Sequence, residues 1–115
     1  MEFNSLIAKI NEFSKLRDWD QFHSIKNLTM ALSVESSELV EIYQWLSEEE
    51  SNDKTNEKVM QRTREELADI LIYLLRISSK LNINMEEAVL SKMQQNAEKY
   101  PVDKSKGNSK KYNDL

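Results

Sequence analysis

Hydrophobic residues recur every three or four positions through most of this chain, a spacing that places them on one face of an α-helix. One glycine and one proline occur in 115 residues, and both lie after residue 100. Because tight hairpin turns usually require glycine, this distribution argues against a sheet. We predict an all-α, four-helix bundle-like domain. Its helices are expected at about residues 2–16, 24–49, 55–81 and 84–100.

Local signals mark where these helices begin and end. Ser24 is a suitable N-cap for the second helix, and Asn84 can begin a capping box for the fourth. Pro101 ends the fourth helix, because a residue that precedes proline is disfavoured in the α region. The residues beyond it are rich in lysine. We therefore predict one domain over residues 1–100 and a flexible, basic C-terminal tail over residues 101–115.

The third predicted helix is apolar around almost its whole circumference. Between residues 67 and 77 its polar positions form one narrow strip, which Glu66 extends by a turn. A helix that is apolar all round must be buried all round, and a four-helix monomer covers one side of it more easily than both. We therefore expect a homo-oligomer with this helix at the subunit contact. The strip consists of Glu66, Asp69, Tyr73 and Arg76.

Four carboxylates occupy positions where acidic residues are rare. Glu35 falls at the centre of the apolar stripe of the second helix, and Glu38 follows it by one turn. Glu66 and Asp69 repeat this spacing on the third helix. If the two helices pack side by side, the four acids converge, and a hard cation such as Mg²⁺ or Mn²⁺ would compensate their charge. The alternative is ion pairing with nearby arginines, namely Arg62, Arg64 and Arg76.

Composition narrows the classes of function further. A net charge of -4 argues against binding to a nucleic-acid polymer, and the absence of cysteine excludes a disulfide scaffold and a thiolate nucleophile. His23 is the sole histidine, which disfavours a redox iron site and a typical zinc site. The chain has no glycine-rich phosphate loop and no apolar run long enough to span a membrane. We expect a cytoplasmic protein without a signal peptide.

An all-oxygen metal site suggests a substrate that carries phosphates, because the cation neutralises phosphate oxygens. Lys92 and Asn96 lie one turn apart on the fourth helix, and Lys80 ends the third. These side chains could contact phosphate, or they could be solvated surface residues. Trp19 and Trp45 could stack on a nucleobase, or they could serve in packing.

These residues, in this order, resemble the MazG-type all-α nucleoside triphosphate pyrophosphohydrolases and most closely their dCTP-hydrolysing branch. The metal motif of that family is E-x-x-E followed by E-x-x-D on the next helix, which here reads Glu35-Ser36-Ser37-Glu38 and Glu66-Leu67-Ala68-Asp69. The resemblance covers most of the chain from Arg17 onward. The shared strings are RDWDQFH (17–23), NLTMALSVESSELVEIYQW (27–45), EELADILIYLL (65–75), AVLSKM (88–93) and a KYP–KY ending at 99–101 and 111–112.

The resemblance implies Mg²⁺-dependent cleavage between the α and β phosphates of dCTP, yielding the monophosphate and pyrophosphate. It also implies a tetramer built from two dimers, with the four acids as catalytic metal ligands. Lys111 and Tyr112 would fold over the site of a neighbouring subunit. The complete set of predicted substrate contacts is Trp19, His23, Asn27, Trp45, Tyr73, Lys80, Lys92, Asn96, Tyr100 and Lys111.

Three alternatives remain at the level of the sequence. Two keep the same chemistry, with a broad specificity for NTPs and dNTPs or with a preference for modified pyrimidines. The third is a helical interaction module whose acidic helix end binds a basic partner. The expected physiological role of an enzyme of this kind is sanitation or balancing of the nucleotide pool.

Overall fold

The computed structural model describes residues 2–111, and the described residues form helices without strands. The all-α prediction is confirmed. The chain divides into two compact units, Met1–Asn82 and Ile83–Leu115. In the first unit the elements are α1 (Glu2–Leu16), the 3₁₀ turn η1 (Asp20–Phe22), α2 (Ile25–Tyr43), α3 (Glu48–Ser51) and α4 (Glu57–Lys80). In the second they are α5 (Met85–Lys99) and α6 (Val102–Ser105).

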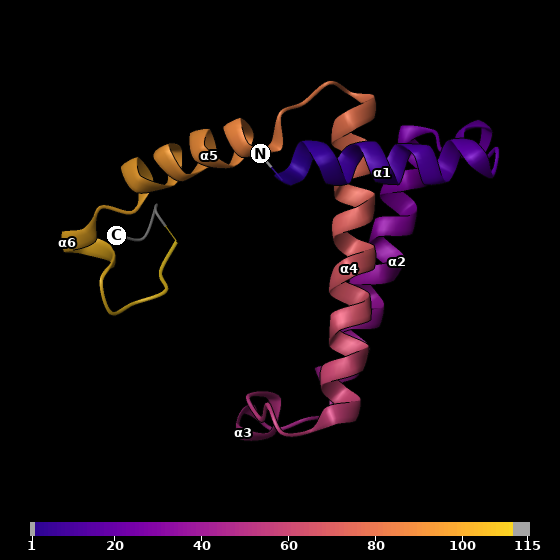
Figure 1. The fold of residues 1–115 in the computed structure, drawn as a ribbon. Coiled ribbons are helices and arrows are strands. Elements are labelled where there is room, and N and C mark those ends of the chain that lie inside the picture. The colour runs from indigo at the N-terminus through magenta and orange to yellow at the C-terminus, as the bar shows by residue number, and fades with distance from the viewer. Residues whose placement is uncertain (1, 112–115) are drawn as a thin grey trace. The chain divides into compact units, whose positions relative to one another are not determined.

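The long helices α2 and α4 pack side by side, and α1 lies across α4 (Figure 1). Hydrophobic side chains from α2 and α4 form the buried core of the first unit, namely Leu28, Ile42 and Leu75. Ser24 begins α2 as predicted, with its hydroxyl accepting a hydrogen bond from the Asn27 backbone N–H at 3.1 Å. This pairing of two helices that are distant in sequence positions the site described below.

The second predicted helix is shorter than expected. The periodicity predicts a helix to about residue 49, but α2 ends at Tyr43, and a separate turn, α3, follows. The cause is a capping box: Ser47 Oγ accepts from the Glu50 backbone N–H at 3.0 Å, and Glu50 Oε1 accepts from the Ser47 backbone N–H at 2.9 Å. Such a box marks the beginning of a new helix. The prediction of one continuous helix over residues 24–49 is therefore wrong.

The second unit contains α5 and the beginning of the basic tail. Asn84 caps α5 by accepting from the Glu87 backbone N–H at 3.0 Å, as predicted. After Pro101 the chain forms one further helical turn, α6, which no sequence pattern predicts. The division into a domain at 1–100 and a tail at 101–115 stays a prediction. None of the helices in the described part of the chain has the length and hydropathy to cross a membrane.

The apolar surface of α4 is only partly covered within the first unit. Leu67 is 53% exposed and Ile72 is 41% exposed, whereas Leu75 on the same helix is 1% exposed. The helix therefore buries one face against α2 and leaves hydrophobic side chains on another. Exposed hydrophobic side chains mark a site of association where they form a patch.

Candidate metal centre and neighbouring pocket

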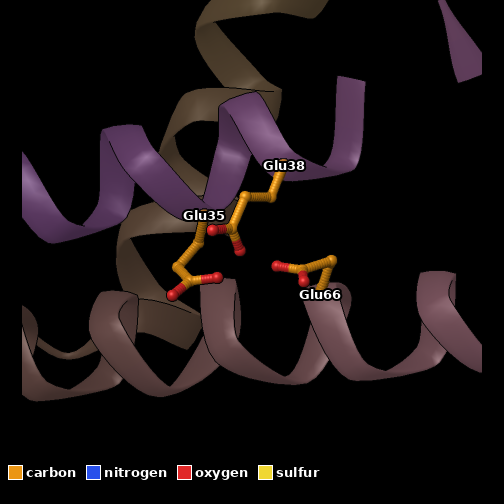
Figure 2. A group of neighbouring side chains, drawn as sticks. All are labelled: Glu35, Glu38 and Glu66. Atoms are coloured by element: carbon orange, nitrogen blue, oxygen red, sulfur yellow. The ribbon is translucent and has the colours of Figure 1, made fainter. Parts of the chain in front are cut away.

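Three of the four predicted acids come together where α2 faces α4. Glu35 and Glu38 extend from α2, and Glu66 reaches toward them from α4 (Figure 2). Each offers a carboxylate oxygen, and these three oxygens lie within 4.8 Å of one another. The i, i+3 spacing of the two α2 residues places both on the side of the helix that meets α4. The predicted convergence of acids is thus present for these three residues.

The electrostatics of this cluster are unfavourable without a cation. The pKa of Glu35 is raised from 4.5 to about 7, first by its side-chain hydrogen bond with Glu66, next by burial and then by Glu38 and Asp69. In addition, Glu35 Oε2 and Glu66 Oε2 are buried and have no hydrogen-bond partner among the described residues. Buried oxygens of this kind usually have a partner. Carboxylate oxygens are the donors that Mg²⁺ and Mn²⁺ prefer, so the residues fit a hard divalent cation.

The arginines considered as alternative partners do not neutralise the cluster. Arg76 is held by Asp20, Asn11 and His23, and Arg64 donates to Gln61 Oε1 at 2.7 Å. Between the described residues, no hydrogen bond or ion pair joins an arginine to these acids. The ion-pairing alternative therefore has no support in the structure.

Asp69 lies outside the group of three acids and instead lines a neighbouring pocket of about 420 Å³. Its charge still contributes to the raised pKa of Glu35, so the pocket adjoins the carboxylates. Burial, followed by Glu35 and Asp69, also raises the pKa of Tyr73, which lines the same pocket. The polar strip of α4 thus supplies one residue to the acid cluster, Glu66, and three to the pocket. Those three are Asp69, Tyr73 and Arg76.

The opposite side of the pocket is aromatic. Phe13 and Trp19 meet edge to face with their ring centroids 5.7 Å apart, and the His23 ring lies 6.2 Å from Trp19. These rings come from α1 and from the connection that leads to α2. Flat rings that border a cavity of this size suit a planar aromatic ligand.

The structure places only some of the other predicted contacts at this pocket. Trp19, His23 and Tyr73 line it. Asn27 instead donates to the Phe22 carbonyl at 2.9 Å, which fixes the turn before α2, and Trp45 is 87% exposed just beyond α2. Lys80 ends α4 and is not among the residues that line the pocket. The other predicted contacts are Lys92, Asn96, Tyr100 and Lys111, which belong to the second unit, and Tyr112 lies outside the described residues.

Sequence reasoning missed the contribution of α1 to the pocket. In the sequence, Phe13 reads only as part of a helical apolar stripe, and Arg76 only as a possible partner of the acids. The periodicity does contain one usable signal, because Arg76 follows Asp69 by seven residues and so lies on the same face two turns later. The lining residues without a predicted role at the site are Lys9, Ile10, Phe13, Ser14, Ile72 and Arg76.

Comparison with known proteins identifies the class to which this fold and site belong. The model of the MazG-like family matches residues 30–115, and the chain belongs to that family. The chain is similar to dCTP pyrophosphatase 1 of Rattus norvegicus, with 42% identity over 105 residues, and to that of Homo sapiens, with 38%. Each alignment covers 90% of this chain, which spans 62% of the length of those relatives.

A solved structure gives the same result at the level of the fold. The chain is similar to a crystal structure described as a pyrophosphatase from Archaeoglobus fulgidus, with a TM-score of 0.80 and 38% sequence identity. That alignment covers 88% of this chain and 94% of the archaeal chain. The similarity extends well beyond the acidic motif.

Proposed function

We propose that this protein hydrolyses a nucleoside triphosphate, with dCTP as its substrate, to the monophosphate and pyrophosphate. The observation that carries the proposal is the group of three facing carboxylates, with two buried oxygens that lack partners, beside an aromatic pocket. The names of the relatives support pyrophosphohydrolysis and dCTP in particular. The expected role is sanitation or balancing of the nucleotide pool.

We assign Glu35, Glu38, Glu66 and Asp69 as the residues that hold a divalent cation, Mg²⁺ or Mn²⁺. The first three offer carboxylate oxygens within 4.8 Å of one another, and Asp69 follows Glu66 by one turn and lines the pocket. When bound, such a cation supplies charge neutralisation for phosphate oxygens. The carboxylates for their part fix where the phosphates lie relative to the pocket.

The pocket holds the base in this proposal. Trp19 and Phe13 offer apolar ring surface, and base–aromatic stacking contributes about 1–3 kcal/mol for each base. Because Asp69 lines the pocket and lies one turn from Glu66 on α4, a base in the pocket would place its phosphates near a cation held by the acids. Positioning of this kind is a large part of catalysis in phosphoryl chemistry.

The test is pyrophosphate release from the eight canonical nucleotides in millimolar Mg²⁺. We expect selective release from dCTP, and we expect Glu38→Gln to abolish it. Release from many nucleotides would contradict the dCTP assignment and indicate broad specificity. If no canonical nucleotide is hydrolysed, modified pyrimidines are tried next, and failure there too would favour a helical interaction module.

We also propose that the active form is a homo-oligomer, a tetramer of two dimers, with α4 at the subunit contact. The exposed hydrophobic side chains of α4 support this, because a monomer would leave them in water. Light scattering should give the mass of four chains. Leu67→Gln should shift the protein toward smaller species, whereas Glu65→Gln, two residues earlier on α4, should not. A native protein with the mass of one chain would refute the tetramer. Equal masses for the two variants would refute the placement of α4 at the subunit contact.

Stabilisation by Mg²⁺ should depend strongly on pH. The pKa of Glu35 is about 7 in the metal-free fold, above its ordinary value of 4.5, so the unbound protein loses stability as pH rises from about 4.5 through 7. A cation competes with that proton and replaces it above pH 7. Melting curves should therefore show a larger gain from Mg²⁺ at pH 8 than at pH 5.5. In Glu35→Gln this difference should shrink; a gain independent of pH in the native protein would exclude this explanation.

A further inference from the structure

Arg76 is a buried residue at the centre of a polar network that the proposed reaction does not explain. Its side chain is 7% exposed, and its guanidinium group makes three separate contacts. Nη1 donates to Asn11 Oδ1 at 2.8 Å, Nη2 donates to Asp20 Oδ1 in an ion pair, and Nε donates to His23 Nδ1 at 3.4 Å. Asn11 in turn donates to Ser79 Oγ at 2.8 Å. The network joins α1, η1 and α4, and two of its residues, His23 and Arg76, line the pocket.

The contact with His23 determines the chemical form of the imidazole. A guanidinium N–H has no acceptor capacity, so His23 Nδ1 must accept, and it cannot carry a proton at the same time. The ring proton of the neutral imidazole is therefore on Nε2. Because Nδ1 is engaged by Arg76, Nε2 is the ring nitrogen that remains for a ligand, and His23 is one of the residues that line the pocket.

Burial and the charges around His23 together favour the neutral imidazole ring. Burial lowers its pKa most, the positive charge of Arg76 adds to this, Asp20 opposes it, and Lys80 lowers it further. Lys9, Asp69 and Tyr73 also line the same pocket. The charge of Arg76 itself is compensated by its ion pair with Asp20, so the network brings a hydrogen-bond donor to the pocket without adding a net charge.

We propose that Arg76 is a positioning residue that fixes His23 as the Nε2–H tautomer, so that the pocket offers a nucleobase a neutral hydrogen-bond donor. The role in base binding rests on the proposed function, whereas the tautomer itself does not. An imidazolium in the pocket would attract the triphosphate and compete for it with a cation held by the acid cluster. A neutral donor instead pairs with an acceptor on the edge of the base and leaves the phosphates to the cation site. Substrate orientation thus depends on a residue that need not touch the reacting atoms.

Because His23 is the sole histidine, its state can be read directly by NMR on histidine-labelled protein without nucleotide. In the native protein the two-bond nitrogen–proton couplings should report the Nε2–H tautomer at neutral pH, with a titration midpoint below 6.5. A nuclear Overhauser contact should connect Arg76 Nε–H to the Cε1 proton of His23. A protonated Nδ1, rapid exchange between tautomers or absence of this contact would overturn the proposal, and none of these measurements requires a variant.

Arg76→Met and the matched variant Lys80→Met separate the hydrogen bond from the charge. Both remove a positive charge near His23, but only Arg76→Met removes the donor to Nδ1. We expect mixed tautomers in Arg76→Met and an unchanged tautomer in Lys80→Met. A folded Arg76→Met protein that retains the Nε2–H tautomer would show that another group fixes the ring. If Arg76→Met does not fold, the native-state contact and tautomer decide the question.

Kinetics connect the tautomer to the substrate. Loss of one hydrogen bond to a neutral group should raise KM for dCTP in Arg76→Met about five- to tenfold, with a smaller change in kcat. An unchanged KM in a folded variant with mixed tautomers would overturn the link to substrate positioning. If the native protein hydrolyses no nucleotide but His23 has the expected tautomer, the proposed function fails while the role of Arg76 in fixing the ring stands.

Discussion

Glu66→Gln is expected to lower the rate of pyrophosphate release by more than about 100-fold. Glu66 is the residue of α4 in the three-carboxylate cluster, so it would link a bound cation to the helix that carries Asp69, Tyr73 and Arg76. Replacement of groups that merely support metal ligands costs about 10–100-fold, and loss of a ligand should cost more. Steady-state assays at several Mg²⁺ concentrations provide the measurement, since a weakened site should also require more Mg²⁺.

The neighbouring residue provides a matched control. Glu65 is exposed on the same helix and accepts a hydrogen bond from Gln61 Nε2 at 3.0 Å, away from the cluster. Glu65→Gln removes the same charge and should leave the rate within about twofold, as expected for a surface substitution. Equal losses in the two variants would indicate a general effect of charge. Near-native activity in Glu66→Gln would refute the metal assignment.

Glu66→Gln should also stabilise the metal-free protein at pH 8 and remove its thermal stabilisation by Mg²⁺. The amide keeps the size of the side chain and removes one of the carboxylates that repel one another across the α2–α4 contact. Thermal melting in the presence of a chelator measures the first effect, and melting with Mg²⁺ measures the second. A lower melting temperature in chelator would mean that Glu66 stabilises the fold, as a structural residue does.

Leu75→Ala is expected to lower the free energy of unfolding by about 3 kcal/mol, within the range of 2.7–5.0 kcal/mol observed for buried leucines elsewhere. Leu75 is 1% exposed on α4 and is one of the two largest fully buried side chains among the described residues, with Leu28 on α2. Few hydrophobic side chains are buried among the described residues, so few can move into the cavity that Leu75→Ala would leave. Urea unfolding at constant protein concentration measures the loss.

Leu16→Ala is the matched control for that measurement. Leu16 ends α1 and is 75% exposed, so the same substitution there should change the free energy of unfolding by less than about 0.5 kcal/mol. If both variants lose the same amount, the stability of the α2–α4 pair does not depend on Leu75. A large loss confined to Leu75→Ala would identify this helix pair as the unit on which the acid cluster depends.

Much of the site could be predicted from the sequence because its elements are local. The period of hydrophobic residues along the chain defines the helices, and Ser24 and Asn84 mark where two of them begin. The i, i+3 spacing places each pair of acids on one helix face. An acid at the centre of an apolar stripe requires a compensating charge, and this requirement singles out Glu35 from the sequence alone.

What the sequence determined, then, was the all-α class, the four main helices, the acid pairs and the family resemblance; the tertiary structure decided which faces meet. Asp69 has the same spacing as its counterpart on α2, yet it faces a pocket rather than the group of three acids. From the sequence, Arg76 is a possible partner for those acids. In the structure it instead contacts Asp20 and Asn11, which lie 56 and 65 positions earlier in the chain. Helical periodicity is a property of neighbouring residues, whereas a pocket wall built from α1, the following connection and α4 depends on packing between distant segments.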